Sequence, residues 1–257
     1  MKYIRRIGAL CLLTLCVICV AAQASMPGVI QFSEADSDIS GSSFVEETRE
    51  QASASAQVEI PTATLSPEAA ALPWNLTLVN FTHPVPEGWS FEVKELSNGR
   101  KVDARIYADL QAMFDACRAE GLTPRVNTAY RTYEDQQDML VTKYRQYKKQ
   151  GLSHEQAQAK ALTVASYPGY SEHQLGLAVD INSANQEKCS NDRVWKWMKE
   201  NCQDYGFIWR YPGVKSEITG ISNEDWHFRY VGREAARYIM ENQLCLEEYL
   251  QQQYGIQ

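Results

Sequence analysis

The composition of the chain changes near residue 73, and this change limits the part that can fold. Residues 25–73 are rich in Ser, Ala, Thr, Glu and Pro, and they carry eight acidic residues against one basic residue. Such a segment cannot bury enough apolar surface to offset the conformational entropy that folding costs. We therefore expect a disordered acidic tether over 25–73 and a single folded domain over 74–257.

The first 24 residues have the layout of a secretory signal peptide. Three basic residues precede an apolar run over 7–22, and the run ends in the small-x-small sequence Ala-Gln-Ala at 22–24. The run is shorter than the ~20 apolar residues that a spanning helix needs, which favours cleavage over an uncleaved N-terminal anchor. We expect the protein outside the cytoplasm, secreted or associated with the cell envelope, with membrane contact only if residues 1–24 are retained.

The predicted domain is close to electrically neutral. Residues 74–257 contain 21 basic and 24 acidic residues, without a basic stripe along any one segment. Proteins that bind nucleic acid usually carry such a stripe, so a nucleic-acid partner is not expected.

Four of the seven cysteines lie in the predicted domain, at Cys117, Cys189, Cys202 and Cys245. In an exported protein they could form two disulfides, and their pairing is not fixed by the sequence. The alternative is that Cys117 and Cys202 are small apolar core residues on helices. No CxxC pair is present, which argues against a zinc site made of thiolates.

Apolar spacing and turn signals predict an α+β domain. Helices are expected over five stretches: Ile106 to just before Gly121, 133–149, 153–166, 194–205 and 233–251. Strands are expected within four stretches: 123–132, 176–182, 207–211 and 227–231. Ser153 and Gln156 form a predicted capping box at the start of the third helix. Because strands and helices do not alternate in βαβ units of one length, we expect a small, mainly antiparallel sheet flanked by helices.

Two of the four histidines stand at the ends of apolar strands, each with a carboxylate nearby. His173 precedes Asp180 by seven residues, and His227 follows Glu224 by three. Residues an odd number apart in a strand point to opposite faces, so His173 must lie in the loop before the strand if it is to meet Asp180.

Two imidazoles and one carboxylate are typical ligands of a catalytic zinc ion, and Glu224 could then act as the general base. The alternative from the residues alone is that His173 bonds to Asp180 and His227 is a core residue. A buried, unpaired aspartate is costly, which favours the metal. The other two histidines, His83 and His154, lie among polar residues and are expected on the surface.

A longer pattern carries a family resemblance. Its residues are Ser171, His173, Gly176, Ala178 and Asp180, followed by Glu224, Trp226, His227 and Arg229. The pattern resembles the paired signature of the VanY-like D-alanyl-D-alanine carboxypeptidases, which are zinc peptidases of the Hedgehog/DD-peptidase fold. Further segments in the family's order extend the resemblance over nearly all of 74–257: LVN (78–80), VDAR (102–105), AYRTYEDQ (129–136), YGFIWRYP (205–212) and TG (219–220).

The resemblance implies one zinc ion held by His173, Asp180 and His227, with Glu224 as the catalytic base. It implies that Arg131 holds the carboxylate side of the substrate or the oxyanion, for which a guanidinium fork is suited. It also implies substrate contacts from four more residues: Gln136, Ser171, Tyr211 and Trp226.

Taken without the resemblance, several of these residues have plainer interpretations. Tyr211 and Trp226 could pack the strands, and Gln136 could be a solvated helix residue. Asn223 and Asp225 depart from the residues usual in the family, an aromatic and a proline, so substrate preference is less well determined than the chemistry.

The implied reaction is removal of the C-terminal D-alanine from peptidoglycan stem peptides by a monomeric D,D-carboxypeptidase. An L,D-carboxypeptidase, which trims a tetrapeptide to a tripeptide, and a peptidoglycan endopeptidase or dipeptidase remain as alternatives. A non-catalytic, zinc-stabilised wall-binding module is a further alternative. Glu224 argues against that module, because a structural zinc site needs no general base.

Overall fold

Strand β4 (Ala178–Ser183) lies inside a four-stranded sheet of order β3-β4-β6-β5, in which every neighbouring pair is antiparallel. The other strands are β3 (Pro124–Thr128), β5 (Phe207–Tyr211) and β6 (Glu224–Tyr230). This confirms the predicted α+β architecture. The computed structural model describes residues 72–256, and no helix in this range is both long and apolar enough to cross a membrane. The predicted signal peptide, and the predicted tether up to residue 71, lie outside the described residues.

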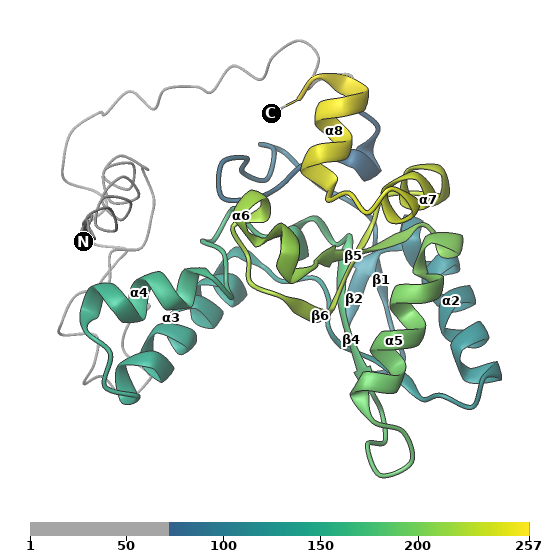
Figure 1. The fold of residues 1–257 in the computed structure, drawn as a ribbon, viewed down its shortest axis with the longest axis horizontal. Coiled ribbons are helices and arrows are strands. Elements are labelled where there is room, and N and C mark those ends of the chain that lie inside the picture. Colours follow the sequence, from purple (N-terminus) through teal and green to yellow (C-terminus); the bar gives the residue numbers. More distant parts are fainter. Residues whose placement is uncertain (1–71, 257) are drawn as a thin grey trace, which may run out of the picture.

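One face of the sheet is apolar and is covered by helices α2 (Tyr107–Ala119) and α5 (Asn191–Asn201) (Figure 1). Successive residues of a strand point to opposite faces, so Val179 and Ile181 of β4 both face these helices. They are buried in one cluster with the helix residues Leu110, Met113, Cys117, Val194 and Met198. Asp180, which lies between them, therefore points to the opposite face.

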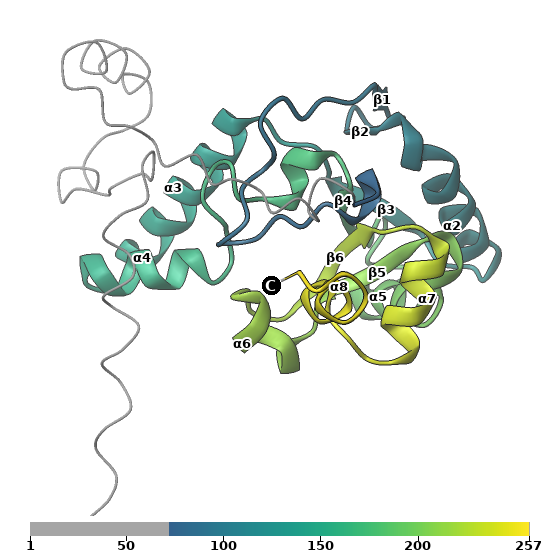
Figure 2. The same cartoon turned by 90° about the horizontal axis from the view of Figure 1, so that it is seen from above.

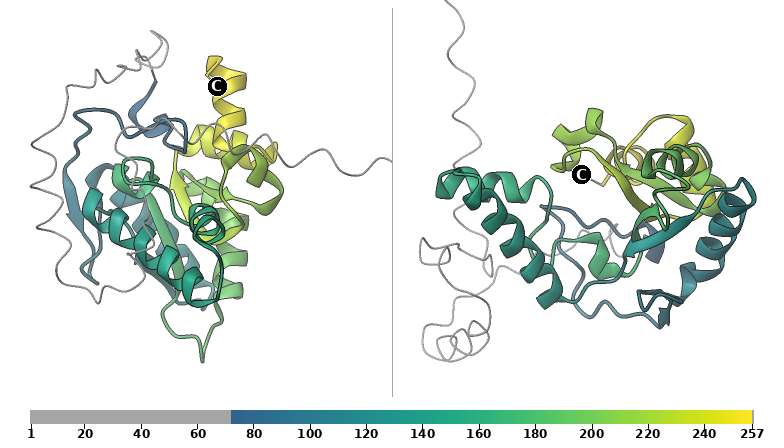
Figure 3. Two further views of the ribbon diagram at one scale, coloured as in Figure 1. Left: turned by 90° about the vertical axis from the view of Figure 1, so that its left-hand side faces the viewer. Right: turned by 90° about the horizontal axis from the view of Figure 1, so that it is seen from below.

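Helices α3 (Tyr133–Lys149) and α4 (His154–Leu162) form a pair that stands away from the sheet, on the side opposite α2 (Figure 2, Figure 3). The pair has its own small core: Leu140, Tyr144, Ala157, Ala161 and Ala165. Helix α4 begins at the predicted capping box of Ser153. It ends at Leu162, short of the predicted Ser166, where the bonding tightens to three-residue turns: Thr163 N–H donates to the Lys160 carbonyl and Val164 N–H to the Ala161 carbonyl.

The C-terminal part, predicted as one helix over 233–251, forms two helices, α7 (Arg233–Glu241) and α8 (Leu246–Tyr254). That prediction was wrong because Gln243 adopts a φ of 53°, which a continuous helix does not allow, and Glu248 caps the new helix. Both helices pack on a second buried cluster, which includes Leu76, Leu78, Ile208, Val231, Ala235, Ile239, Leu246 and Leu250. Apolar residues continue at helical spacing across the break between α7 and α8, so the sequence pattern does not indicate it.

The remaining elements are short. A hairpin of β1 (Val93–Glu95) and β2 (Lys101–Asp103) was missed from the sequence, because β1 is exposed throughout and shows no apolar alternation. One-turn helices complete the chain: η3 (Trp74–Leu76), η4 (Ala104–Ile106), η5 (Glu172–Leu175), η6 (Cys202–Tyr205), η7 (Gly213–Lys215) and α6 (Ser216–Thr219). The predicted fourth helix is therefore α5 followed by η6.

All four cysteines of the domain are buried free thiols. Burial raises the pKa of Cys117 and of Cys202 to about 12, so neither is a reactive thiolate at neutral pH. The structure therefore agrees with the interpretation of Cys117 and Cys202 as small core residues, and within residues 72–256 neither of the two possible disulfides is formed.

Candidate active site

The three predicted metal ligands meet on the polar face of the sheet. Asp180 of β4 and His227 of β6 are directly paired across the two strands, so their side chains project together. His173 comes from the turn η5, outside strand geometry, as its odd separation from Asp180 requires. Asp180 Oδ1 lies 3.4 Å from His173 Nε2 and 3.3 Å from His227 Nδ1.

The short link between His173 and β4 depends on Gly176. This residue has a φ of 74°, and a Cβ added to it would lie 2.6 Å from the Phe91 ring. Any other residue would be strained in this conformation and would clash with that ring. Glycine therefore lets the chain turn directly from η5 into β4, which brings His173 over Asp180.

The hydrogen bonds of His173 leave a lone pair on the nitrogen that faces the site. Its Nδ1 lies 2.8 Å from the carbonyl oxygen of Ala129, which only accepts, so Nδ1 carries the proton. Asp180 Oδ1 is buried without a hydrogen-bond partner of good geometry. Ligand atoms of His173, Asp180 and His227 all lie within 4.8 Å of one another. This set of two imidazoles and a carboxylate fits one zinc ion with an open coordination position.

An irregularity in β6 brings Glu224 to the same face as His227. In a regular strand, two residues three apart would point to opposite faces. Trp209 of β5 pairs with Phe228 of β6, and the next recorded pair is Tyr211 with Glu224. The step between the two pairs is two residues in β5 but four in β6, so β6 contains extra residues at this point. The register shift turns Glu224 toward the site, where its Oε2 lies 3.5 Å from His227 Nδ1.

Burial sets the protonation of these groups. Burial, assisted by the charge of Asp180, raises the pKa of Glu224 to about 7, as suits a general base that works near neutral pH. Burial and the Arg131 charge lower the pKa of His173 to about 4, which keeps it neutral. Burial alone would lower the pKa of His227, but the neighbouring Asp180 and Glu172 carboxylates outweigh it and raise this pKa to about 9.

Arg131 lies beside the three ligands, and Gln136 holds it there. Arg131 Nη2 is 4.0 Å from Asp180 Oδ2, and its Nη1 donates to Gln136 Oε1 at 2.6 Å. The Gln136 amide nitrogen donates to the Ser166 carbonyl at 2.8 Å, and the residue is fully buried. The interpretation of Gln136 as a solvated helix residue is therefore wrong. Arg131 Nε is buried without a partner, which leaves one donor for a substrate.

The other predicted substrate contacts surround the ligands to different extents. The Tyr211 ring centroid lies 4.7 Å from that of His227, and Ser171 is a buried residue directly before η5. Trp226 is half-buried, and its ring centroid lies 6.0 Å from that of Trp195, so it packs against a side chain of α5.

The remaining two histidines lie apart from the site. Each is half-buried, where the sequence predicted exposure. His154 Nδ1 is 3.0 Å from the Tyr144 hydroxyl, inside the core of the α3–α4 pair. His83 bonds to Asn80 in a tight turn.

Sequence analysis missed a buried ionic group next to the ligands. It consists of Glu172, Arg210, Arg229 and Glu247, of which the first three are fully or almost fully buried. The sequence does contain an indication of this group. Arg210 and Arg229 each lie inside an aromatic strand, where an arginine is unusual and needs a buried partner.

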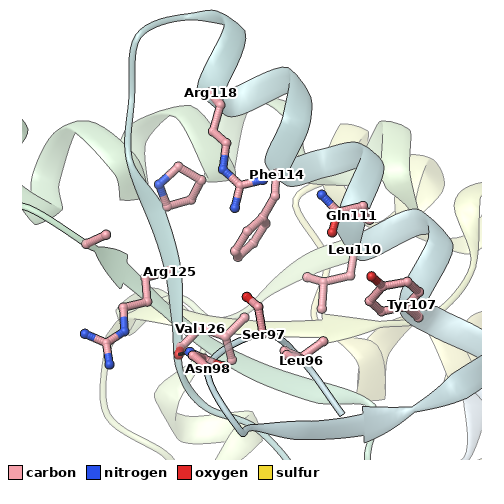
Figure 4. Close-up of a pocket in the computed structure, with 12 residues that line it drawn as sticks. Leu96, Ser97, Asn98, Tyr107, Leu110, Gln111, Phe114, Arg118, Arg125 and Val126 are labelled. Atoms are coloured by element: carbon pink, nitrogen blue, oxygen red, sulfur yellow. Dashed lines mark hydrogen bonds between the residues drawn. The ribbon is translucent and has the colours of Figure 1, made fainter. Parts of the chain in front are cut away.

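A separate surface pocket of about 230 Å³ lies between α2, β3 and the β1–β2 turn (Figure 4). Its lining includes the apolar residues Leu110, Phe114 and Val126, with Arg118 and Arg125 projecting at its edge. None of the predicted site residues lines it, so it is distinct from the candidate active site.

Comparison with known proteins identifies the family. The profile of the VanY D-alanyl-D-alanine carboxypeptidases matches residues 99–233, which include all nine predicted site residues. The chain belongs to the VanY family.

VanY relatives are similar over most of the described domain. A D-alanyl-D-alanine carboxypeptidase of Enterococcus faecalis is 51% identical over 177 residues, which are 69% of this chain and 66% of that relative. The match thus spans slightly under two thirds of the relative's length.

Two solved VanY structures superpose on the domain. VanYB in complex with D-alanine-D-alanine is 49% identical, with a TM-score of 0.69 over 70% of this chain and 99% of that one. A variant of the vancomycin-resistance D,D-pentapeptidase VanY in complex with Zn(II) is 50% identical, with a TM-score of 0.68 over 69% and 99%.

For this VanY-family protein, zinc affinity should fall as the pH falls. The pKa of His227 is about 9 without a metal, so below pH 9 a metal must displace a proton from its ring. The dissociation constant for zinc should rise roughly tenfold for each pH unit lowered between pH 8 and 6. Competition against a chromophoric chelator at pH 6, 7 and 8 measures this, and a constant affinity over that window would contradict it.

Proposed function

We propose that this protein is a zinc-dependent D,D-carboxypeptidase that hydrolyses the C-terminal D-alanine from peptidoglycan stem peptides. The observation that carries the proposal is the placement of Glu224 and Arg131 beside the three-ligand set. A zinc ion that only held the fold together would need neither a buried base at 3.5 Å from His227 nor a buried guanidinium with a free donor. The substrate assignment is supported by the D-alanyl-D-alanine carboxypeptidase relative and by the neighbour bound to D-alanine-D-alanine.

The buried carboxylate of Glu224 moves the proton in this reaction. When bound, zinc supplies a Lewis acid that polarises the scissile carbonyl and lowers the pKa of water toward ~7. Glu224 takes a proton from the attacking water at a carboxylate oxygen and passes it to the nitrogen of the departing D-alanine. Water is the nucleophile, so no covalent enzyme intermediate forms.

Arg131 binds negative charge on the substrate. Gln136 fixes one arm of the guanidinium, and the buried Nε–H has no protein partner. This donor suits the substrate carboxylate or the oxyanion that develops during attack. Ser171, Tyr211 and Trp226 are proposed to contact the rest of the substrate.

The proposed place of action is outside the cytoplasm, where peptidoglycan is found. Support comes from the basic and apolar pattern of residues 1–24, which is typical of a signal peptide. The acidic segment 25–73 would then act as a tether that lets the domain reach its substrate.

The test is mass spectrometry of muropeptides incubated with purified residues 25–257, with and without a zinc chelator. The proposal expects a chelator-sensitive loss of one alanine from a pentapeptide. Loss from a tetrapeptide instead would retain the mechanism and make the protein an L,D-carboxypeptidase. No change in either substrate, with zinc shown to be bound, would overturn carboxypeptidase action in favour of endopeptidase action or wall binding.

Replacement of Arg131 should separate substrate use from metal binding. Arg131→Ala is expected to lower kcat/KM about 100- to 1,000-fold, because a buried donor to the developing charge is lost. Zinc content should stay at the wild-type value, because Arg131 is not a ligand. Steady-state kinetics with metal analysis check this. Arg125→Ala, at an exposed arginine of β3, is the matched control, and normal kinetics in Arg131→Ala would remove the proposed role.

A further inference from the structure

A buried carboxylate lies directly behind the metal ligand His227. Glu172 Oε1 accepts from Arg210 Nε at 2.8 Å and from Arg229 Nη1 at 3.0 Å. Its other oxygen, Oε2, lies 3.4 Å from His227 Nε2. The side chains of Glu172 and both arginines are 0% exposed, so water does not screen these contacts.

This geometry fixes which ring nitrogen of His227 keeps its proton when a metal binds. A carboxylate that receives two guanidinium groups is ionised and can only accept hydrogen bonds. His227 Nε2 must therefore donate to Glu172, which leaves Nδ1, the nitrogen 3.3 Å from Asp180 Oδ1, to bind a metal. Glu172 thus orients His227 as the Ala129 carbonyl orients His173.

The contacts continue from Glu172 to the C-terminal helix. Arg210 presents its other two nitrogens to Glu247 of α8, with Nη1–Oε2 at 2.8 Å and Nη2–Oε1 at 2.6 Å. This paired geometry is the strongest form of an arginine–carboxylate contact. Arg210 is therefore held between the carboxylate behind the metal ligand and the carboxylate of a helix distant in sequence.

The first described segment, residues 75–80, also contacts Glu247 and Arg229 of this buried ionic group. Asn80 donates to Glu247 at 3.2 Å, and Arg229 Nη2 donates to the backbone oxygens of Asn75 and Thr77 at 3.1 and 2.9 Å. Figure 1 shows α8 close to this segment. These partners all lie outside residues 99–233, the part that the family profile matches.

We propose that Glu172 is a positioning residue for the zinc ligand His227, and that Arg210 and Glu247 hold Glu172 in place, which makes helix α8 part of the support of the metal centre. The proposal rests on the zinc dependence proposed above. A buried ionic group contributes little net stability, because desolvation roughly cancels its attraction. A carboxylate behind a histidine ligand, by contrast, strengthens metal binding.

The experiment compares three Glu→Gln variants of the full domain by their zinc dissociation constants. Glu172→Gln is expected to raise the constant about 10- to 100-fold, as for other partners of ligand histidines. Glu247→Gln should raise it by a smaller factor. Glu248→Gln is the matched control, because Glu248 lies next along α8 but pairs with Lys215, and glutamine retains the capping acceptor. It should bind zinc as the wild type does.

A second readout distinguishes positioning from a purely structural role. In the zinc-loaded protein, the NMR signal of the His227 Nε2–H proton should shift in Glu172→Gln and remain in place in Glu248→Gln. Thermal unfolding of the metal-free variants reports their folding. If Glu172→Gln does not fold alone, Glu172→Gln with Arg229→Gln removes one charge of each sign and still lacks the anionic acceptor.

The outcomes separate this proposal from the proposed function. Wild-type zinc affinity in a folded Glu172→Gln or double variant would overturn the role of Glu172. An unchanged constant in Glu247→Gln would overturn the contribution of α8. A wild-type domain that binds no zinc would instead defeat the proposed function itself.

Discussion

Glu224→Ala should lose about 100- to 10,000-fold in kcat/KM while keeping its zinc. The side chain is not one of the three converging ligands, but it is a buried carboxylate beside His227 with its pKa raised to about 7. Its removal takes away the carboxylate that is proposed to accept the proton from water and return it to the leaving amine. Zinc affinity should change little, because all three ligand side chains remain.

The measurement is release of D-alanine from a pentapeptide, with zinc analysis of the same sample. Glu217→Ala removes an exposed glutamate from the nearby turn α6 and serves as the control, with wild-type rates expected. If Glu224→Ala turned over substrate at the wild-type rate, the assignment of the base would be wrong.

His227→Ala should lose both metal and activity. A partner behind a ligand is typically worth about 10- to 100-fold in metal affinity, so loss of the ligand itself should exceed about 100-fold. The change also leaves Asp180 with one imidazole at contact distance instead of two, and Glu172 without its histidine donor. We expect a metal-free protein at micromolar zinc and no D-alanine release.

Zinc titration by calorimetry checks this, with His83→Ala as the control, because the bonds of that histidine within residues 72–256 lie in its own turn. Near-stoichiometric zinc in His227→Ala, at the affinity of the wild type, is the result that would remove this residue from the ligand set. Addition of excess zinc should not restore activity to His227→Ala.

The positions of His173 and Asp180 could be predicted from the sequence, because the argument needed only the two-residue period of a strand. An aspartate between Val179 and Ile181 in an apolar strand must point away from the core those residues fill. An odd separation then places the histidine outside the strand. The arrangement of β4 and η5 follows from these local rules.

The position of Glu224 could not be predicted in this way. A regular strand would have pointed it away from His227, and only the register shift against β5 reverses it. Such a shift depends on how two strands pair, and it produces no periodic pattern of residues from which it could be predicted. The sequence placed Glu224 just before the predicted strand 227–231 as a possible general base, and the family resemblance implied the same role.

The partners of Arg210 and Gln136 that are distant in the chain could not be predicted from the sequence either. The carboxylate that meets Arg210 comes from a helix 37 residues further on, and the break that begins this helix lies within an unbroken apolar spacing. Gln136 looked like a solvated helix residue because its buried partners, Arg131 and the Ser166 carbonyl, meet only in the folded chain.

The α3–α4 pair can be exchanged as a unit without moving the site. Gln136 of α3 connects the segments before and after the pair, because it bonds to Arg131 just before it and to the Ser166 carbonyl just after it. The part of the pair beyond Gln136 packs on its own core, so its length and surface can vary while the two hydrogen bonds of Gln136 are kept. Chimeras that exchange 139–162 between relatives should therefore alter the surroundings of the site and keep Arg131 in register with the metal ligands.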